Sequence, residues 1–552
     1  MHEQGHGDSS NSTPTQVSTR RRASPNMGKG RLLKRALAAA LVLSPSLGCT
    51  NVGNYFHNCF KVGPNYERPS APVANDWIDA DDKRISTADN DLREWWKVFN
   101  DPVLNALVAR AYQQNLTLRE AGFRVLEARA RRGIAVGNLF PQTQEAFGGY
   151  DRYKISGAST LSSYTREEFF SVWSGGFNLA WELDFWGRFR RAVEAADADL
   201  DASVEFYDQV LVTLIGDVAT TYIQIRTLEQ RIRFARDNVV LQGENLKIAQ
   251  AKFSAGQTTQ VDVDQAKSDL GQTQASIPPL QVSLREAQNQ LCILLGEPPH
   301  QLNLELGAGP IPKSPPQAIV GIPGDLLRRR PDVRHAERLL AGQSARIGIA
   351  TAELYPHIAI TGTIGVEADR VKDLFTEKAM IGSIGPSLQW NILNYGRLLN
   401  NIRMQDARFG EFLAHYQQTV LNANAEVENG LIGFLKSAEQ ARYLQEAAKA
   451  SADGVKIAMV NYENGKIPFT AVVIFQQNLV QQQDQLAQAL GNIPGSLVQV
   501  YRALGGGWQL RLEDPAILAA DENVTPPPPS PTTQPDVLLP NTVPLRPSAP
   551  MP

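Results

Sequence analysis

Apolar residues recur every seven positions along two long stretches of the chain. The first series is Leu211, Val218, Ile225 and Ile232, and the second is Val420, Val427 and Phe434. A sustained seven-residue stripe is typical of helices that pack together with a slight supercoil. The first stretch, from 188 to about 253, contains no proline and little glycine. At about 1.5 Å per residue it predicts a helix on the order of 100 Å long, which no ordinary globular core requires.

The two stretches belong to two copies of one unit. The segment WELDFWGR at 181–188 is echoed by WNILNYGR at 390–397, and AKFSAG at 251–256 is echoed by VNYENG at 460–465. Both pairs are separated by 209 positions, so the offset holds across the whole helical stretch between them. The pattern therefore predicts an internal duplication of a long-helix unit.

Each long helix is predicted to end at a glycine, Gly256 or Gly465, because glycine readily takes the left-handed conformation that caps a helix. A second helical stretch follows at once, so each copy is expected to be a helical hairpin. The residues that we assign to the two tips are Phe253, Gly256, Tyr462 and Gly465. Prolines at 278, 279 and 494 predict kinks or breaks in the returning helices.

Period-two alternation precedes each long helix. It covers 169–183, with a weaker partner near 144–150, and then 358–366 and 382–392. Polar loops are predicted between these strands, at 151–168 and 367–379. Alternation with one apolar face is the pattern of transmembrane barrel strands, and the alternative is a soluble sheet packed on the helices. Four strands cannot close a barrel, since the smallest known barrels have about eight, so the membrane reading requires an oligomer.

The amino-terminal region has the plan of a bacterial export signal. The segment MGKGRLLKRALAAALVLSPSLGC at 27–49 places basic residues before a short apolar run at 36–43, and Met27 is an alternative start. It ends in SLGC, which resembles a lipoprotein cleavage box with Cys49 as the acylated residue. Leucine stands one place later than in that box, and Cys59 is the alternative acylation site. A third reading is an ordinary cleaved signal followed by two free cysteines.

Composition narrows the function. The chain has 552 residues and a formal net charge of -3, so no overall basic field points to nucleic acid. Three widely spaced cysteines suit neither a disulfide framework nor a zinc site. The histidines are scattered, and no phosphate loop or Gly-x-Ser-x-Gly motif is evident, so we expect no enzyme activity, cofactor or metal. Apart from the signal, no apolar run reaches the roughly 18 residues of a membrane-spanning helix.

Long segments resemble the TolC-like outer-membrane efflux proteins and, within them, the lipoprotein branch that includes NodT and OprM. The matching segments are CFKVGPNYERP at 59–69, REWWKVFNDPVLNALVARAYQQNLTLREA at 93–121, LLGEPP at 294–299, LLRRRPDVRHAERLLAGQSARIGIATAELYP at 326–356 and YRALGGGW at 501–508. The resemblance implies a mainly α fold with a transmembrane β component. Duplicated long helical hairpins would form a periplasmic α-barrel, and four strands per protomer would join a twelve-stranded β-barrel shared by a homotrimer.

The resemblance also implies a function. The chain would be the outer-membrane channel, or duct, of a tripartite efflux or secretion system that exports small molecules passively and catalyses no chemistry. The tips would meet a periplasmic adaptor (membrane fusion) protein, which joins the duct to an inner-membrane transporter of the RND type. The protein would be lipid-anchored in the outer membrane and extend into the periplasm. The alternative is a periplasmic coiled-coil adaptor or scaffold without a pore, but the duplication and the alternating strands favour the duct.

In that family, a tyrosine before the second tip glycine, with a basic residue and carboxylates after it, resembles a latch that closes the aperture. Tyr462 is present, but the aligned basic and acidic places hold Ile467, Ala471 and Ile474. The first copy carries Asp262, which matches Ala471 under the 209 offset, and Asp264 nearby. Three Asp262 side chains that faced the lumen would form a cation-attracting ring, and the alternative is a solvated helix start.

The sequence divides into four expected regions. They are an amino-terminal extension with the signal at 1–48, a first efflux repeat with an equatorial segment at 49–310, a second repeat at 311–510 and a Pro-rich tail at 511–552. The composition of the tail predicts disorder. Asp101-Pro102 predicts a helix start, RRRPD at 328–332 predicts another with internal ion pairs, and GGG at 505–507 predicts a bend.

Overall fold

The computed structural model of the chain describes residues 52–88, 91–154, 156, 169–302 and 306–513. It contains two units, Met1–His57 and Asn58–Pro552. Of the first unit, helix α2 (Val52–His57) is described, whereas Cys49 and the predicted signal lie outside the described residues. The predicted tail also lies outside them from 514 onward.

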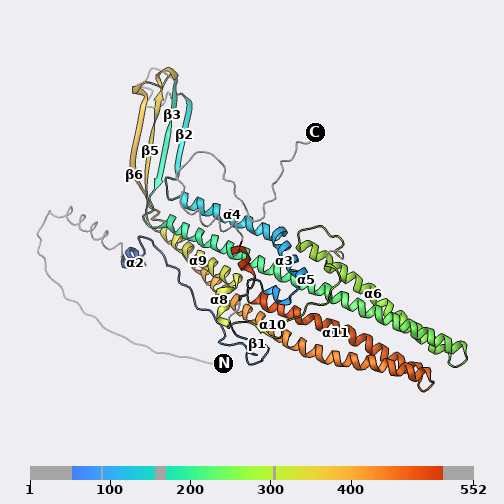
Figure 1. The fold of residues 1–552 in the computed structure, drawn as a ribbon. Coiled ribbons are helices and arrows are strands. Elements are labelled where there is room, and N and C mark those ends of the chain that lie inside the picture. The colour runs from blue at the N-terminus through green and yellow to red at the C-terminus, as the bar shows by residue number, and fades with distance from the viewer. Residues whose placement is uncertain (1–51, 89–90, 155, 157–168, 303–305, 514–552) are drawn as a thin grey trace, which may run out of the picture. The chain divides into compact units, whose positions relative to one another are not determined.

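Two long helical hairpins dominate the second unit (Figure 1). Helix α5 (Arg188–Ser254) returns as α6 (Gln260–Leu294), and α10 (Arg397–Glu463) returns as α11 (Phe469–Ala503). Each helix of the second hairpin begins and ends 209 residues after its counterpart in the first. The predicted duplication of a helical hairpin is therefore confirmed.

Proline does not break the returning helices. Helix α6 continues through Pro278 and Pro279, and α11 continues through Pro494, so the predicted breaks are wrong. Proline removes one backbone hydrogen bond and crowds the preceding turn. However, α6 packs along α5, and α11 packs along both α10 and α5. These contacts hold the helical path on both sides of each proline.

All four long helices end in the same glycine cap. After α5, the Gly256 N–H donates to the Phe253 carbonyl and the Gln257 N–H donates to the Lys252 carbonyl, both at 2.9 Å. This pair of bonds is the Schellman motif, which satisfies carbonyls left over at a helix end. The other three helices close in the same way, at Gly296, Gly465 and Gly505. The φ angles of the four glycines lie between +68° and +76°, where a side chain would be strained.

Four antiparallel strands form a sheet at the end of the hairpins that is opposite the tips (Figure 1). They are β2 (Thr143–Lys154), β3 (Phe169–Glu182), β5 (His357–Ala368) and β6 (Met380–Gln389), in the order β2-β3-β5-β6. The four predicted strands are confirmed, with two changes at their ends. Residues 151–154 were expected in a loop but pair with 169–172, and residues 390–392 lie beyond β6 because β5 offers no partner before His357.

The two copies meet in the sheet where β3 pairs with β5. Gly176 lies opposite Gly365 in this pair. A Cβ atom on Gly176 would lie 2.4 Å from the Ile364 carbonyl oxygen, and one on Gly365 would lie 2.6 Å from the Gly175 carbonyl oxygen. Both distances are shorter than any real contact, so the two backbones approach this closely only because neither residue has a side chain.

Shorter elements surround the middle of the hairpins. The helices are α3 (Pro102–Gln114), α4 (Leu116–Gly137), α8 (Leu326–Arg329) and α9 (Pro331–Ala352), and β1 (Ile85–Ser86) pairs in parallel with β4 (Ala318–Ile319). Short 3-10 turns are η2 (Trp95–Phe99), η4 (Pro323–Asp325), η5 (Val371–Asp373), η6 (Glu377–Ala379) and η7 (Trp508–Glu513). No helix in the described ranges combines the length and the apolarity needed to cross a bilayer.

The predicted starts of α3 and α9 are confirmed. The Asp101 carboxylate accepts the backbone N–H groups of Val103 and Leu104, and Pro331 is the first residue of α9. Within α9, Arg338 pairs with Glu337 at 2.7 Å, as the sequence predicts.

The main apolar core lies where η2 and the end of α11 pack on the middle of α5. Trp95 is buried and lies 5.6 Å, between ring centroids, from Tyr501. A Cβ atom on Gly506 would lie 2.8 Å from a ring atom of Trp95, and Gly507 has a φ of +101°. The predicted bend at 505–507 is therefore a tight turn that brings η7 onto the core.

Arg334 does not pair within α9, contrary to the prediction. Its guanidinium binds Glu205 of α5 at 2.7 Å and lies 4.3 Å from the Trp508 ring centroid. Asp208, which is fully buried, accepts a hydrogen bond from Arg511 Nε at 2.6 Å. Because α9 packs directly on α5, the carboxylates across this interface lie within reach of Arg334. The cluster ties η7 to both helices.

This cluster predicts a pH dependence of stability. Burial raises the pKa of Glu205 from 4.5 to about 7, against the opposing charge of Arg334. Between these values the folded chain binds more protons than the unfolded chain, so the free energy of unfolding falls as pH rises through this window. We expect Glu205→Gln to lose less thermal stability than the wild type between pH 5 and pH 8. Glu244→Gln, on the exposed face of α5, is the control, and equal pH slopes for wild type and Glu205→Gln would contradict the prediction.

Candidate functional site

The predicted tip residues lie at the two hairpin turns. Gly256 and Gly465 have open space around them, so a left-handed backbone, and not crowding, requires glycine there. Phe253 is exposed at the end of α5, whereas Tyr462 is 4% exposed at the end of α10. The two copies thus differ at equivalent places, because the aromatic side chain of the second hairpin is buried.

Tyr462 joins the second hairpin to the first. Its hydroxyl donates a hydrogen bond to Asp262 Oδ2 at 3.2 Å, and the Thr258 hydroxyl donates to the same oxygen. Burial raises the pKa of Tyr462, so the phenol keeps the proton that it donates. The structure therefore brings together two residues that the sequence assigned to separate features, the tip and the aperture acids.

Lys252 completes this contact, and the sequence analysis did not identify it. Its ammonium donates to the Tyr462 carbonyl oxygen at 2.9 Å and lies 4.9 Å from the centroid of the Tyr462 ring. The aligned basic place in the second copy is Ile467, so the first copy supplies the cation instead. A lysine in the last turn of a helix is the available sequence signal, since it suits free carbonyl groups, but its partner lies on another helix.

A small apolar core surrounds this contact. Its buried members are Ala249, Val263, Ala266, Ala458, Tyr462, Phe469 and Val472. The rings of Tyr462 and Phe469 meet edge to face, with centroids 5.0 Å apart. All four long helices contribute to the core, so the two tips of one chain pack as one body.

The two predicted aperture acids have different surroundings. Asp262 is partly buried and faces Tyr462 of its own chain. Asp264 is exposed, accepts a hydrogen bond from Gln260 Nε2 at 2.9 Å and lies 3.8 Å from Lys267 Nζ. Of the two carboxylates, Asp264 is the more accessible to ions in solution.

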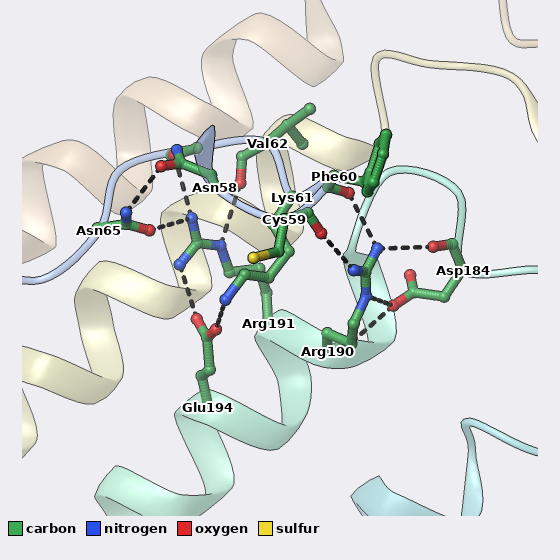
Figure 2. Close-up of polar contacts among 11 residues, drawn as sticks. Asn58, Cys59, Phe60, Lys61, Val62, Asn65, Asp184, Arg190, Arg191 and Glu194 are labelled. Atoms are coloured by element: carbon green, nitrogen blue, oxygen red, sulfur yellow. Dashed lines mark hydrogen bonds and ion pairs between the residues drawn. The ribbon is translucent and has the colours of Figure 1, made fainter. Parts of the chain in front are cut away.

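Near the start of α5 a second site contains Cys59. We name residues 58–66 the amino-terminal strap. Figure 2 shows two consecutive arginines of α5 binding the strap backbone. Arg190 donates to the carbonyl oxygens of Cys59 at 2.6 Å and Phe60 at 2.9 Å, while Asp184 binds the same guanidinium at 2.9 Å. Cys59 and Phe60 have φ angles of +52° and +61°, which are unfavourable for residues with a side chain and are held here by these bonds.

Arg191 binds the next residues of the strap. It is almost fully buried and donates to the carbonyl oxygen of Val62 at 3.1 Å and to the Asn65 side chain at 2.9 Å. Glu194 binds both Arg191 and Lys61, which balances the two positive charges (Figure 2). The thiol of Cys59 is exposed beside this network. The sequence singled out Cys59 but gave no signal for the arginine pair.

Comparison with known proteins agrees with this architecture. The chain matches the model of the outer membrane efflux protein family at residues 107–297 and 322–506. Nodulation protein T of Rhizobium leguminosarum bv. trifolii is 28% identical over 81% of this chain and 94% of its own. The pyoverdine export outer membrane protein OpmQ of Pseudomonas aeruginosa is 30% identical over 76% of this chain and 88% of its own.

A solved structure supports the same assignment. The outer-membrane channel OprN superposes with a TM-score of 0.76 at 32% sequence identity, covering 81% of this chain and 99% of that one. Both family matches contain one long hairpin each, so the two copies are two family units. The chain therefore belongs to the outer membrane efflux protein family, and it is an outer-membrane efflux channel protein that extends into the periplasm.

Proposed function

We propose that three copies of this chain form one passive duct through which a tripartite pump exports small molecules. The open edges of the sheet support this proposal. In the described residues, β2 and β6 each pair on one side only, which leaves a row of backbone donors and acceptors free. Pairing β2 of one copy with β6 of the next would satisfy both edges and close a twelve-stranded barrel.

The helices support the same arrangement. Helix α9 packs on α5 and also on α10, whereas its counterpart α4 packs chiefly on α5. Phe123 and Ile134 of α4 are 49% and 67% exposed. If the two copies have equivalent neighbours, the missing neighbour of α4 is α10 of the next chain. A ring of three chains would cover this face of every α4.

The assembly that we propose has two further partners. A periplasmic adaptor (membrane fusion) protein would bind the hairpin tips, and an inner-membrane transporter of the RND type would supply the energy. The relatives carry different names, one for pyoverdine export and one for nodulation, so related channels serve different systems. We therefore expect the transporter, and not this chain, to select the cargo. The two repeats of the duct would occupy 49–310 and 311–510, and the matched segments lie inside them.

The oligomeric state tests this proposal. We expect the full chain to fractionate with the outer membrane as a heat-modifiable trimer and to conduct ions in a planar bilayer. Heating before electrophoresis should convert the trimer to monomer. A monomer that stays in the periplasmic fraction and shows no conductance would contradict the duct and favour a scaffold without a pore.

We further propose that the tip contact around Tyr462 holds the aperture closed. The hydroxyl of Tyr462 hydrogen-bonds a carboxylate, a contact that typically stabilises by about 1.5–3 kcal/mol. Its loss in Tyr462→Phe is expected to raise the closed-state leak conductance about tenfold or more, since about 1.4 kcal/mol corresponds to a factor of ten. Single-channel recording in a planar bilayer measures this leak.

Tyr443→Phe is the matched control for the tip. Tyr443 lies on α10 with 55% of its surface exposed, so its hydroxyl has no buried partner to lose. A leak as low in Tyr462→Phe as in Tyr443→Phe would exclude the hydroxyl contact from closure. Asp262→Ala and Asp264→Ala, tested separately, would then report whether either carboxylate sets cation selectivity.

We propose that the protein is anchored by a lipid on Cys49, with Cys59 as the alternative. Cys49 follows the apolar run of the signal, whereas Cys59 follows four bulky or polar residues, Tyr55 to Asn58. If Cys49 is acylated, the exposed thiol of Cys59 stays free. Cys49→Ser is then expected to lose metabolic palmitate label, while Cys59→Ser keeps it. The reverse result would place the anchor on Cys59.

A further inference from the structure

Polar residues fill the helix interface between the main core and the tip core. We name this group the polar seam. Its members are Asn238, Gln242 and Asn245 of α5, Asp269 of α6 and Gln476 of α11, each 2–5% exposed. The three residues of α5 are spaced four and three apart, so they lie on one face of the helix. They stand 9 to 16 residues before the end of α5, which is about 14–24 Å along the helix axis.

The seam contains few hydrogen bonds for its size. Asn238 Nδ2 donates to Gln483 Oε1 of α11 at 2.7 Å, and Gln242 Nε2 donates to Asp269 Oδ2 at 2.9 Å. Burial raises the pKa of Asp269, as expected for a carboxyl group with no cation beside it. These bonds link α5 to α11 and α5 to α6.

Three buried polar atoms of the seam have no hydrogen-bond partner among the described residues. They are Gln242 Oε1, Asn245 Nδ2 and Gln476 Nε2. A buried polar group without a partner carries the full penalty of its lost hydration. Two of these atoms are donors and one is an acceptor, so a different packing of the same helices could pair them with each other or with water. The conformation described here therefore leaves bonding capacity unused.

The second hairpin has no matching buried seam. The positions of α10 that correspond to Asn238, Gln242 and Asn245 are Ala447, Ser451 and Gly454. Asn478 of α11, which corresponds to Asp269, is polar but exposed. One polar contact lies at this level, from Ser451 Oγ to Gln482 Oε1 at 2.6 Å. The seam is thus a property of the first hairpin and of its contact with α11.

We propose that the polar seam is a pivot at which the tip portion of the first hairpin changes its packing against α11 when the duct opens. An apolar interface has one well-packed arrangement, because a shift leaves cavities or exposes apolar surface. Amide side chains can exchange partners across such a shift, and the unpaired atoms gain bonds when they do. The apolar cores on either side keep their own packing. This inference rests on the proposed duct function.

Making the seam apolar tests the pivot. In the full-length trimer, Gln242→Leu, Asp269→Leu and Gln476→Leu together remove two of the three unpaired amides and the carboxyl group. We expect the variant to melt at a higher temperature and to open at least about tenfold less often in a planar bilayer, with the closed-state conductance unchanged. Hydrogen exchange at 238–245 is expected to slow in parallel.

Two controls accompany this variant. Ser451→Ala with Gln482→Leu removes the polar contact at the same level of the second hairpin and is expected to leave the opening frequency unchanged. Asp269→Asn keeps a polar partner for Gln242 and is expected to open as the wild type does. Should the triple variant fail to form trimers, Gln476→Leu alone is expected to slow opening in the same direction.

The outcomes separate the pivot from the duct. Wild-type gating that the apolar variant retains, or an equal slowing in the Ser451→Ala and Gln482→Leu control, would overturn the pivot alone. Absence of any wild-type conductance would overturn the duct, and the pivot with it.

Discussion

The packing of neighbours along α5 and α10 is the interaction on which the other parts of Asn58–Pro552 depend. Each of these helices has 67 residues without interruption. Helices of this length owe most of their stability to an apolar face packed on other elements. Helix α5 receives such contacts from α4 and α9 near the sheet and from α6 and α11 toward the tip. The strap, the C-terminal turn and the tip core all attach to surfaces that these helices provide.

The two copies share a backbone but divide the chemistry between them. At the tip, Lys252 and Asp262 come from the first copy and Tyr462 comes from the second. In the hairpins, the buried amides lie on α5, whereas α10 has small residues at the same level. A ring built from alternating copies would therefore alternate in polarity as well. Duplication supplied the geometry, and the divergence of the copies supplied contacts that one copy paired with itself could not make.

Much of this fold is predictable because its signals are local and repeated. Seven-residue spacing marks the long helices, and glycine at 256 and 465 marks where they stop. The sequence failed where the outcome depends on a neighbour. Proline at 278 breaks an isolated helix but not one held by α5, and Arg334 pairs across to Glu205 because α9 packs there. The site followed the same rule, since Tyr462 and Asp262 were named separately, while Lys252 and Arg190 act on carbonyl groups that no pattern of side chains reveals.

The equal lengths of the hairpins have a consequence for the end of the molecule. All four long helices repeat at 209 residues, whereas α4 and α9 are 215 residues apart and β2 and β5 are 214 apart. The difference in length between the copies therefore arose in and around the strands. One added residue in a helix would move its tip by about 1.5 Å and turn every later side chain by about 100° away from its apolar stripe. The hairpin acts as a ruler, and both tips of a chain lie the same number of residues from the sheet.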